Sequence, residues 1–464
     1  MLFNSIPFLL FLPLVFAAYW ATPGRRAQNA LLVAASYVFY GWWDWRFLSL
    51  IVFSTAVDYA VGRRVAAAEG RRRRAWLALS LGANLGLLGV CKYFDFFARS
   101  AAAALSAVGF QADLPTLGLV LPVGISFYTF QTLSYTLDVY RGQLEPTDDP
   151  VAFAAFVAFF PQLVAGPIER ASHLLGQFAA PRRFDPALAR DGARQALYGL
   201  VLKVLVADNL AASVDPAYAA VGAADPWDLL WATFFFALQI YGDFAGYSHM
   251  AIGIARGFGF DLRQNFATPY FAESPGEFWR RWHISLSTWF RDYVYVPLGG
   301  GRVGEARRRL NVLLTFVLSG LWHGASWTFV VWGALHGALV AALPRRAPDA
   351  PPRAPAWRVL GALLTFAAVC LAWVFFRARS LGDALTVLGA LARLPATAPR
   401  APALFPLCLA LGLLLHEWTQ RARPHGLDLA GRPLLVRWGC YVGLGVVLLA
   451  FGREDTVPFI YFQF

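Results

Sequence analysis

The sequence predicts an all-α, polytopic integral membrane protein of about ten to twelve transmembrane helices, with re-entrant or interfacial helices in addition. Hydrophobic residues make up 58% of the chain, the mean hydropathy is +0.50, and only 15% of residues are charged. A soluble domain carries roughly a quarter charged residues. The apolar stretches are long and continuous rather than alternating, which favours membrane helices over a barrel.

Each candidate span is chosen for a length near the ~20 residues that cross a bilayer. The spans fall at residues 5–21, 29–43, 47–61, 75–97, 117–137, 151–165, 193–212, 227–255, 309–341, 357–376, 401–418 and 434–451. The stretch 309–341 is long enough to form two helices.

The net charge of +12 comes almost entirely from arginines. They cluster in short loops between spans, a distribution typical of cytoplasmic loops rather than of a nucleic-acid-binding surface. Arg25, Arg26 and the run 71–74 then lie in the cytoplasm, which places the N-terminus outside a bacterial inner membrane. The first apolar segment lacks a basic flank and a small-residue cleavage site, so we expect a retained span rather than a signal peptide.

The chain is predicted to form one membrane domain over residues 1–464, with a core at about 117–342. A Pro- and Arg-rich stretch, 343–357, is expected to be a cytoplasmic linker before the C-terminal helices at 358–464. The four cysteines lie far apart in apolar stretches, so they indicate neither a disulfide framework nor a metal site. No His, Cys, Asp and Glu set has ligand spacing, and no catalytic metal or bound cofactor is expected.

Three segments differ from plain lipid-facing spans. In residues 121–141, the side chains of Tyr128, Gln131, Tyr135 and Asp138 share one helix face, which indicates either a cavity lining or a polar partner helix. In residues 159–170, two prolines and a glycine interrupt an apolar stretch, and such backbone is tolerated only where protein or water surrounds it. We interpret this second segment as a re-entrant piece.

The third segment, 274–297, is predicted to be one amphipathic helix. Ser274, Pro275 and Glu277 form a helix start with a cap, a proline in the first turn and an acidic residue. His283, Ser287 and Arg291 stand at i, i+4 and i+8, which would form a single polar stripe along that helix.

His323 is the strongest candidate for a functional residue. It lies between glycines in the segment Ser319–Gly324, inside an otherwise apolar stretch. An ionisable residue at membrane depth is costly and therefore indicates function, and imidazole moves protons near neutral pH. The flanking glycines are expected to let backbone approach a reacting carbonyl group.

Seven segments of the chain, in their order along the sequence, resemble the membrane-bound O-acyltransferase superfamily, and most closely its bacterial alginate O-acetylase branch. The matching segments are 121–131, 160–168, 246–260, 265–270, 278–283, 322–324 and the closing 458–464. The resemblance implies that His323 is the catalytic histidine and that His283 is the second important polar residue. Relatives usually carry Asp where this chain has His249, so no role is assigned to that position.

The resemblance further implies an acetyltransferase fed by cytoplasmic acetyl-CoA as the acyl donor. The acetyl group would reach an exported, alginate-like polysaccharide, first through a periplasmic partner that has its own serine nucleophile. In this scheme His323 is the general base, while His283 orients His323, donates to the oxyanion or positions the acceptor. The alternatives are a D-alanyl or other acyltransferase fed by a carrier protein, and a transporter without chemistry, although no internal repeat supports the latter.

The remaining candidates are donor-binding or substrate-binding residues beside the histidines. This set comprises Trp322, Gln131, Arg280, Arg281, Ser287, Arg291 and Asp243. Arginines here could hold coenzyme A phosphates, but topology signals and interface anchoring are the favoured explanation. Asp243 is expected to pair with Lys203 or an arginine, and His336 is expected to be a packing residue. His173, His416 and His425 give no clear signal.

Overall fold

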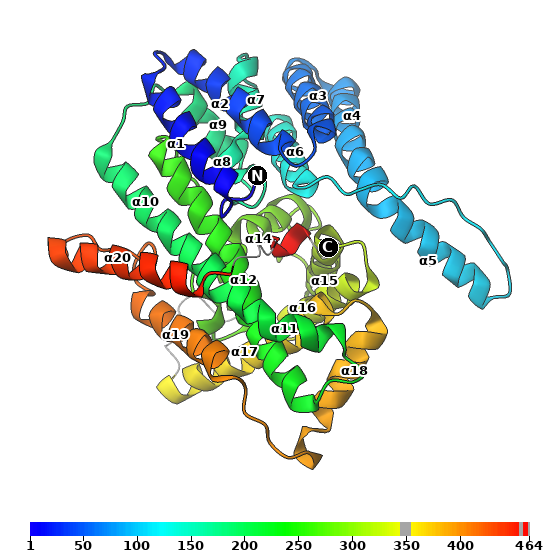
Figure 1. The fold of residues 1–464 in the computed structure, drawn as a ribbon. Coiled ribbons are helices and arrows are strands. Elements are labelled where there is room, and N and C mark those ends of the chain that lie inside the picture. The colour runs from blue at the N-terminus through cyan, green and yellow to red at the C-terminus, as the bar shows by residue number, and fades with distance from the viewer. Residues whose placement is uncertain (344–353, 454–457, 463–464) are drawn as a thin grey trace. The chain divides into compact units, whose positions relative to one another are not determined.

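The computed structural model describes residues 1–343, 354–453 and 458–462, and within these ranges every regular element is helical. The predicted all-α class is therefore confirmed (Figure 1). The expected linker at 343–357 falls largely on 344–353, outside the described residues, as do Gln463 and Phe464 of the closing block. The described chain forms two compact units, Met1–Ala196 with Met250–Arg263, and Leu197–His249 with Gln264–Phe464.

The first unit contains the N-terminal helices and the C-terminal end of the long helix α12 (Pro226–Gly257). Its elements are α1 (Ile6–Ala21), α2 (Arg25–Gly41), η1 (Trp45–Phe47), α3 (Leu48–Ala67), α4 (Gly70–Leu88), η2 (Gly89–Tyr93), α5 (Phe94–Ala107), α6 (Ile125–Tyr140), α7 (Pro150–Ala158), α8 (Phe160–Leu163), α9 (Ala171–Ala179) and most of α10 (Pro186–Leu200).

The second unit contains most of α12 and everything that follows residue 263. Its elements are η3 (Val201–Ala207), α11 (Asp208–Ala219), α12 (Pro226–Gly257), η4 (Pro269–Phe271), α13 (Pro275–Arg281), α14 (Ile284–Phe290), η5 (Arg291–Tyr295), α15 (Glu305–His323), α16 (Trp327–Ala342), α17 (Pro355–Arg377), α18 (Leu381–Ala392), η6 (Leu394–Ala396), α19 (Leu404–Gln420), α20 (Leu434–Phe451) and η7 (Ile460–Phe462).

Within the described residues, five helical stretches are long and apolar enough to cross a membrane, and four shorter apolar helices accompany them. The long stretches are Gly70–Ala107, Pro186–Ala219, Pro226–Gly257, Pro355–Arg377 and Leu434–Phe451. Five is fewer than the ten to twelve spans expected, because several expected spans are shortened or broken. The stretch expected at 117–137 becomes helical only from Ile125, after Gly124 at φ +75°, and the stretch at 151–165 divides at Phe159.

The polar face of α6 packs against polar neighbours within the first unit. The Gln131 amide donates to the Phe156 carbonyl (2.7 Å) and accepts from Gln162 (2.7 Å). Thr136 donates to Asp58 of α3 (3.2 Å). The bonds of Gln131 favour the partner-helix interpretation of that face over a cavity lining, while Thr136 binds a polar neighbour on another side of α6.

The expected pair of helices within 309–341 is observed as α15 and α16, and their close packing depends on glycines. A Cβ atom at Gly320 would stand 2.2 Å from the Phe329 carbonyl oxygen, and one at Gly324 would stand 2.2 Å from the Phe329 ring. Phe329 of α16 thus lies where a side chain at either position would stand, and the approach of backbone to a reacting carbonyl stays a prediction. The role of the two glycines is to bring α16 against the end of α15 that carries His323.

Candidate active site

His323 is the last residue of α15 and lies in an aromatic enclosure of the second unit. Its side chain is buried, because the residue is only 4% exposed. The ring centroid of Trp332 lies 5.0 Å from that of His323, nearly perpendicular to it, and Phe376 follows at 5.5 Å. Tyr461 of the C-terminal segment lies at 5.6 Å. The His323 imidazole is thus enclosed by aromatic rings.

His283 lies beside His323, so the structure brings the two predicted histidines together. Their ring centroids are 6.4 Å apart, and Trp322 contacts both rings, at 6.0 Å from His283 and 5.1 Å from His323. His283 is fully buried. Phe244 of α12 packs edge-on against its ring at 4.6 Å, which completes the apolar surroundings of the pair.

The single helix predicted for 274–297 is wrong, because the chain bends at His283. The start is as expected, since Ser274 caps α13 by accepting from the Glu277 amide (3.3 Å). However, α13 ends at Arg281, and His283 adopts the left-handed conformation at φ +44° before α14 begins. Such backbone is uncommon for a residue with a side chain and clusters at functional sites.

The bend also removes the predicted polar stripe. Ser287 donates back to the carbonyl of Trp282 (3.1 Å), and exposed Arg291 pairs with its neighbour Asp292 (2.7 Å). His283 precedes α14 as its cap residue, so its side chain does not continue the α14 face that carries Ser287. The Ser287 backbone amide donates to the His283 carbonyl (2.9 Å), but no described side-chain bond joins Ser287 or Arg291 to a histidine ring.

Asn265 holds His283 in place and was not singled out by sequence reasoning. Its side-chain oxygen contacts His283 Nδ1 at 3.1 Å and accepts from the Ser285 amide and hydroxyl groups. Its backbone carbonyl accepts from the Ile284 amide (2.9 Å). No spacing or periodicity links residue 265 to residue 283, since only the loop fold brings them together.

Several arginines near the two histidine segments pair with neighbouring acids. Arg281 pairs with Glu277 (2.6 Å), and Arg280 is exposed. Arg308 and Arg309 both bind Glu305, at 2.6 and 2.8 Å. These contacts fit local helix stabilisation, and binding of donor phosphates by Arg280 or Arg281 stays a prediction.

Asp243 pairs with Lys203 as expected, deep in the second unit. Lys203 Nζ lies 2.7 Å from Asp243 Oδ1 and 2.7 Å from Asp208 Oδ1, and all three side chains are at most 5% exposed. The other Asp243 oxygen accepts from the backbone amide of Ile460 (2.6 Å). This buried cluster therefore anchors the C-terminal segment whose Tyr461 contacts His323.

Gln131 lies in the first unit and takes part in the α6 packing described above. His336 is a packing residue as expected, because its Nδ1 accepts from the Trp279 indole (3.2 Å). His249 is buried against Tyr198, with ring centroids 5.1 Å apart. Within the described ranges, no group of three or more His, Cys, Asp and Glu residues could hold a metal ion.

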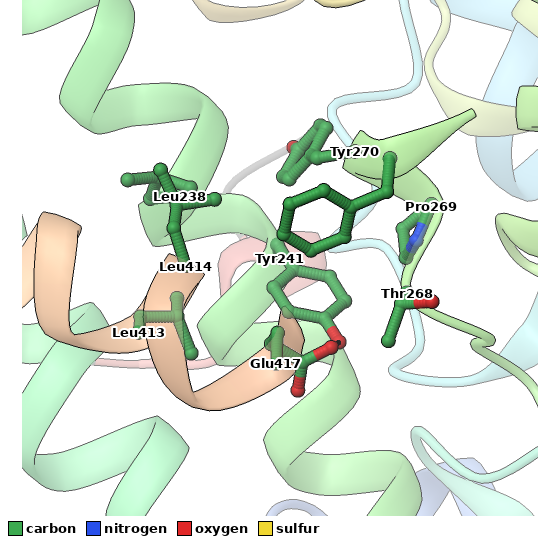
Figure 2. A pocket seen from close by; sticks show the side chains of 9 residues that line it. Leu238, Tyr241, Thr268, Pro269, Tyr270, Leu413, Leu414 and Glu417 are labelled. Atoms are coloured by element: carbon green, nitrogen blue, oxygen red, sulfur yellow. Dashed lines mark hydrogen bonds between the residues drawn. The ribbon is translucent and has the colours of Figure 1, made fainter. Parts of the chain in front are cut away.

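A small cavity lies elsewhere in the second unit, between α12, α19 and the loop at 268–271 (Figure 2). Glu417 at its edge accepts hydrogen bonds from Tyr198 (2.6 Å) and Tyr241 (2.8 Å). Its free volume of about 10 Å³ holds roughly one water molecule. The cavity is too small for an acyl thioester, and neither His283 nor His323 lines it.

His173, which gave no signal in the sequence, connects two loops of the first unit. Its Nδ1 lies 2.9 Å from the buried carboxylate of Glu169, which also accepts from the Arg263 amide (2.6 Å). The hydrogen bond to Glu169 raises the pKa of the His173 imidazole above its ordinary value. The contact is structural, because it fixes the loops before α9 and after α12.

The structure thus combines an all-helical fold that has membrane-spanning helices with a buried pair of histidines. Comparison with known proteins identifies the class. The membrane-bound O-acyltransferase (MBOAT) family matches residues 144–381, and the chain belongs to this family. The protein is therefore an acyltransferase.

Individual relatives share much of the chain. A probable alginate O-acetylase, AlgI, of Azotobacter vinelandii is 42% identical over 84% of this chain and 78% of its own length. A peptidoglycan O-acetyltransferase of Helicobacter pylori is 36% identical over 84% and 79%. A teichoic acid D-alanyltransferase of Bacillus subtilis is 26% identical over 50% and 60%.

Proposed function

We propose that this acyltransferase moves acetyl groups from cytoplasmic acetyl-CoA across the bacterial inner membrane for O-acetylation of an exported, alginate-like polysaccharide. In this proposal the N-terminus lies outside, and a periplasmic protein receives the acetyl group before the polymer does. The observation that carries the proposal is the histidine pair, with ring centroids 6.4 Å apart inside an aromatic enclosure.

The chemistry follows from that enclosure. His323 accepts the proton of the acceptor hydroxyl as its oxygen attacks the acetyl carbonyl, and the C–O bond forms while the C–S bond of the thioester breaks. The leaving thiolate then takes up the proton, so the products are an ester and a free thiol. The surrounding aromatic rings exclude water, which would otherwise hydrolyse the thioester.

An acetyl donor is favoured over a D-alanyl donor by the extent of similarity. The two relatives named for O-acetylation match over 84% of this chain at 36–42% identity. The D-alanyltransferase matches over only half of the chain, at 26% identity. The identity of the acyl donor is a separate part of the proposal and has its own test.

The test is made in cells that carry the gene and produce the polymer. Replacing wild type with His323→Ala is expected to abolish acetyl esters while polymer yield is retained, and His416→Gln serves as a histidine control on α19. Unchanged ester content with His323→Ala would overturn the proposal. Loss of D-alanyl rather than acetyl esters would assign the alternative donor.

A further inference from the structure

The hydrogen-bond partners of the Asn265 side chain distinguish its amide oxygen from its amide nitrogen. The atom that faces the Ser285 backbone amide at 3.2 Å has to be an acceptor, because a backbone N–H only donates. That atom is therefore Oδ1, and Nδ2 on the other side donates to Ser248 Oγ (3.1 Å). Asn265 is only 1% exposed, so both ends of its amide are fixed inside the protein.

The orientation of Asn265 determines the tautomer of His283. Oδ1 carries no hydrogen, so a hydrogen bond to His283 Nδ1 at 3.1 Å needs the proton on Nδ1. The Ser285 hydroxyl does not change this assignment. Its single proton is directed to Oδ1 at 2.9 Å, whereas its oxygen stands 3.4 Å from Nδ1 and can only accept there.

A neutral imidazole with its proton on Nδ1 carries none on Nε2. We propose that Asn265 is a positioning residue that holds His283 as the Nδ1–H tautomer, so that its unprotonated Nε2 can only accept, and not donate, a hydrogen bond in the reaction. This inference rests on the proposed function and narrows it. Of the roles open to His283, donation to the oxyanion by the neutral ring is excluded.

The structure supports a positioning role over simple packing. Asn265 contacts His283 through its side chain and Ile284 through its backbone carbonyl, so one residue sets both the ring and the bend at φ +44°. Holding a residue in such a backbone conformation needs support from its surroundings. A side chain that only filled space would not require three donors on one oxygen.

The kinetic test compares variants of Asn265 in purified, full-length protein supplied with acetyl-CoA. Asn265→Leu keeps the shape and removes the acceptor, and we expect kcat to fall roughly tenfold, the usual effect of one lost buried hydrogen bond, with KM nearly unchanged. Asn265→Asp keeps an acceptor but adds a charge that favours imidazolium. We expect its acid limb of rate against pH to move to higher pH.

Two controls separate this effect from misfolding. Asn311 is equally buried and donates to the Leu298 carbonyl (2.9 Å), so Asn311→Ala should leave the pH profile in place. Ser285→Ala should retain most of the activity, because the bond between Asn265 and His283 remains. An unshifted acid limb in Asn265→Asp, or wild-type kcat in Asn265→Leu, would overturn the proposal.

A second measurement reads the tautomer of His283 without an activity assay. It can therefore show that this inference fails even where the proposed function holds, and the reverse. Nitrogen-15 NMR of histidine-labelled protein, with His283→Gln to assign the signal, reads the tautomer directly. A protonated Nδ1 and an unprotonated Nε2 are expected for His283, with this preference weakened in Asn265→Leu. A signal from Nε2–H would overturn the inference even if the enzyme proves to be an acetyltransferase.

Discussion

Replacement of Gly320 by alanine should disturb the candidate active site without changing a histidine. A Cβ atom at Gly320 would lie 2.2 Å from the Phe329 carbonyl oxygen, whereas real Cβ contacts stay beyond 3.0 Å. The shortfall is 3.0 − 2.2, or at least 0.8 Å. Because the obstructing atom belongs to the backbone, it cannot rotate aside, and α15 and α16 have to move apart.

The separation should misplace the reacting groups. His323 is three residues beyond Gly320 on α15, and Trp332, which packs against its ring at 5.0 Å, lies on α16. A displacement of about 1 Å can cost about 10²-fold in rate. Overpacking of this kind also destabilises a core by roughly 1–3 kcal/mol.

The assay measures kcat for thioester consumption together with the thermal unfolding midpoint in detergent. Gly412→Ala provides a matched control, because Gly412 lies within helix α19 of the same unit and a Cβ atom there meets nothing within 4 Å. We expect Gly320→Ala to lose most of its activity and Gly412→Ala to keep it. Equal activity and stability of the two variants would refute the packing argument.

Two further predictions concern stability. Lys203→Met leaves two buried carboxylates without their cation, so we expect roughly 3–5 kcal/mol of destabilisation in thermal unfolding; a midpoint like that of wild type would contradict the pairing. His173→Gln removes the bond to Glu169, which raises the pKa of the imidazole. Because the pKa of His173 is higher in the folded than in the unfolded protein, its bond to Glu169 stabilises the folded state fully below the ordinary pKa of about 6.5. This stabilisation is lost as the pH rises through the pKa of the folded state. The loss in free energy of unfolding relative to wild type, at most about 1 kcal/mol for a partly exposed pair, should therefore shrink as the pH rises. A difference in thermal unfolding midpoint that does not change with pH would contradict this prediction.

Composition and apolar length were sufficient to predict the helical membrane class, because the bilayer permits few other folds. The hydropathy profile gives more candidate spans than the five described helical stretches that are long and apolar enough to cross a membrane. Apolar residues buried inside the protein, such as those of α7 and α8, resemble lipid-facing residues in a hydropathy profile although they form short, interrupted helices.

The two histidines could be predicted, but their supporting residues could not. His323 stands out because an ionisable residue in an apolar stretch is rare, and the resemblance indicated His283. The bend at His283 is invisible to helical periodicity, since a left-handed residue depends on the loop from Asn265. The contact of Tyr461 with His323 joins positions 138 residues apart, which no local pattern reports.

The most direct test of the account is release of free coenzyme A from radiolabelled acetyl-CoA by purified protein, comparing wild type with His323→Ala. A general base contributes typically 10²–10⁴-fold, so we predict turnover by wild type and a loss of that order in the variant, with both proteins equally folded. Equal turnover by the two proteins, or none by wild type with an acetyl-accepting partner present, would contradict the assignment of this histidine pair as an acetyl-transfer site.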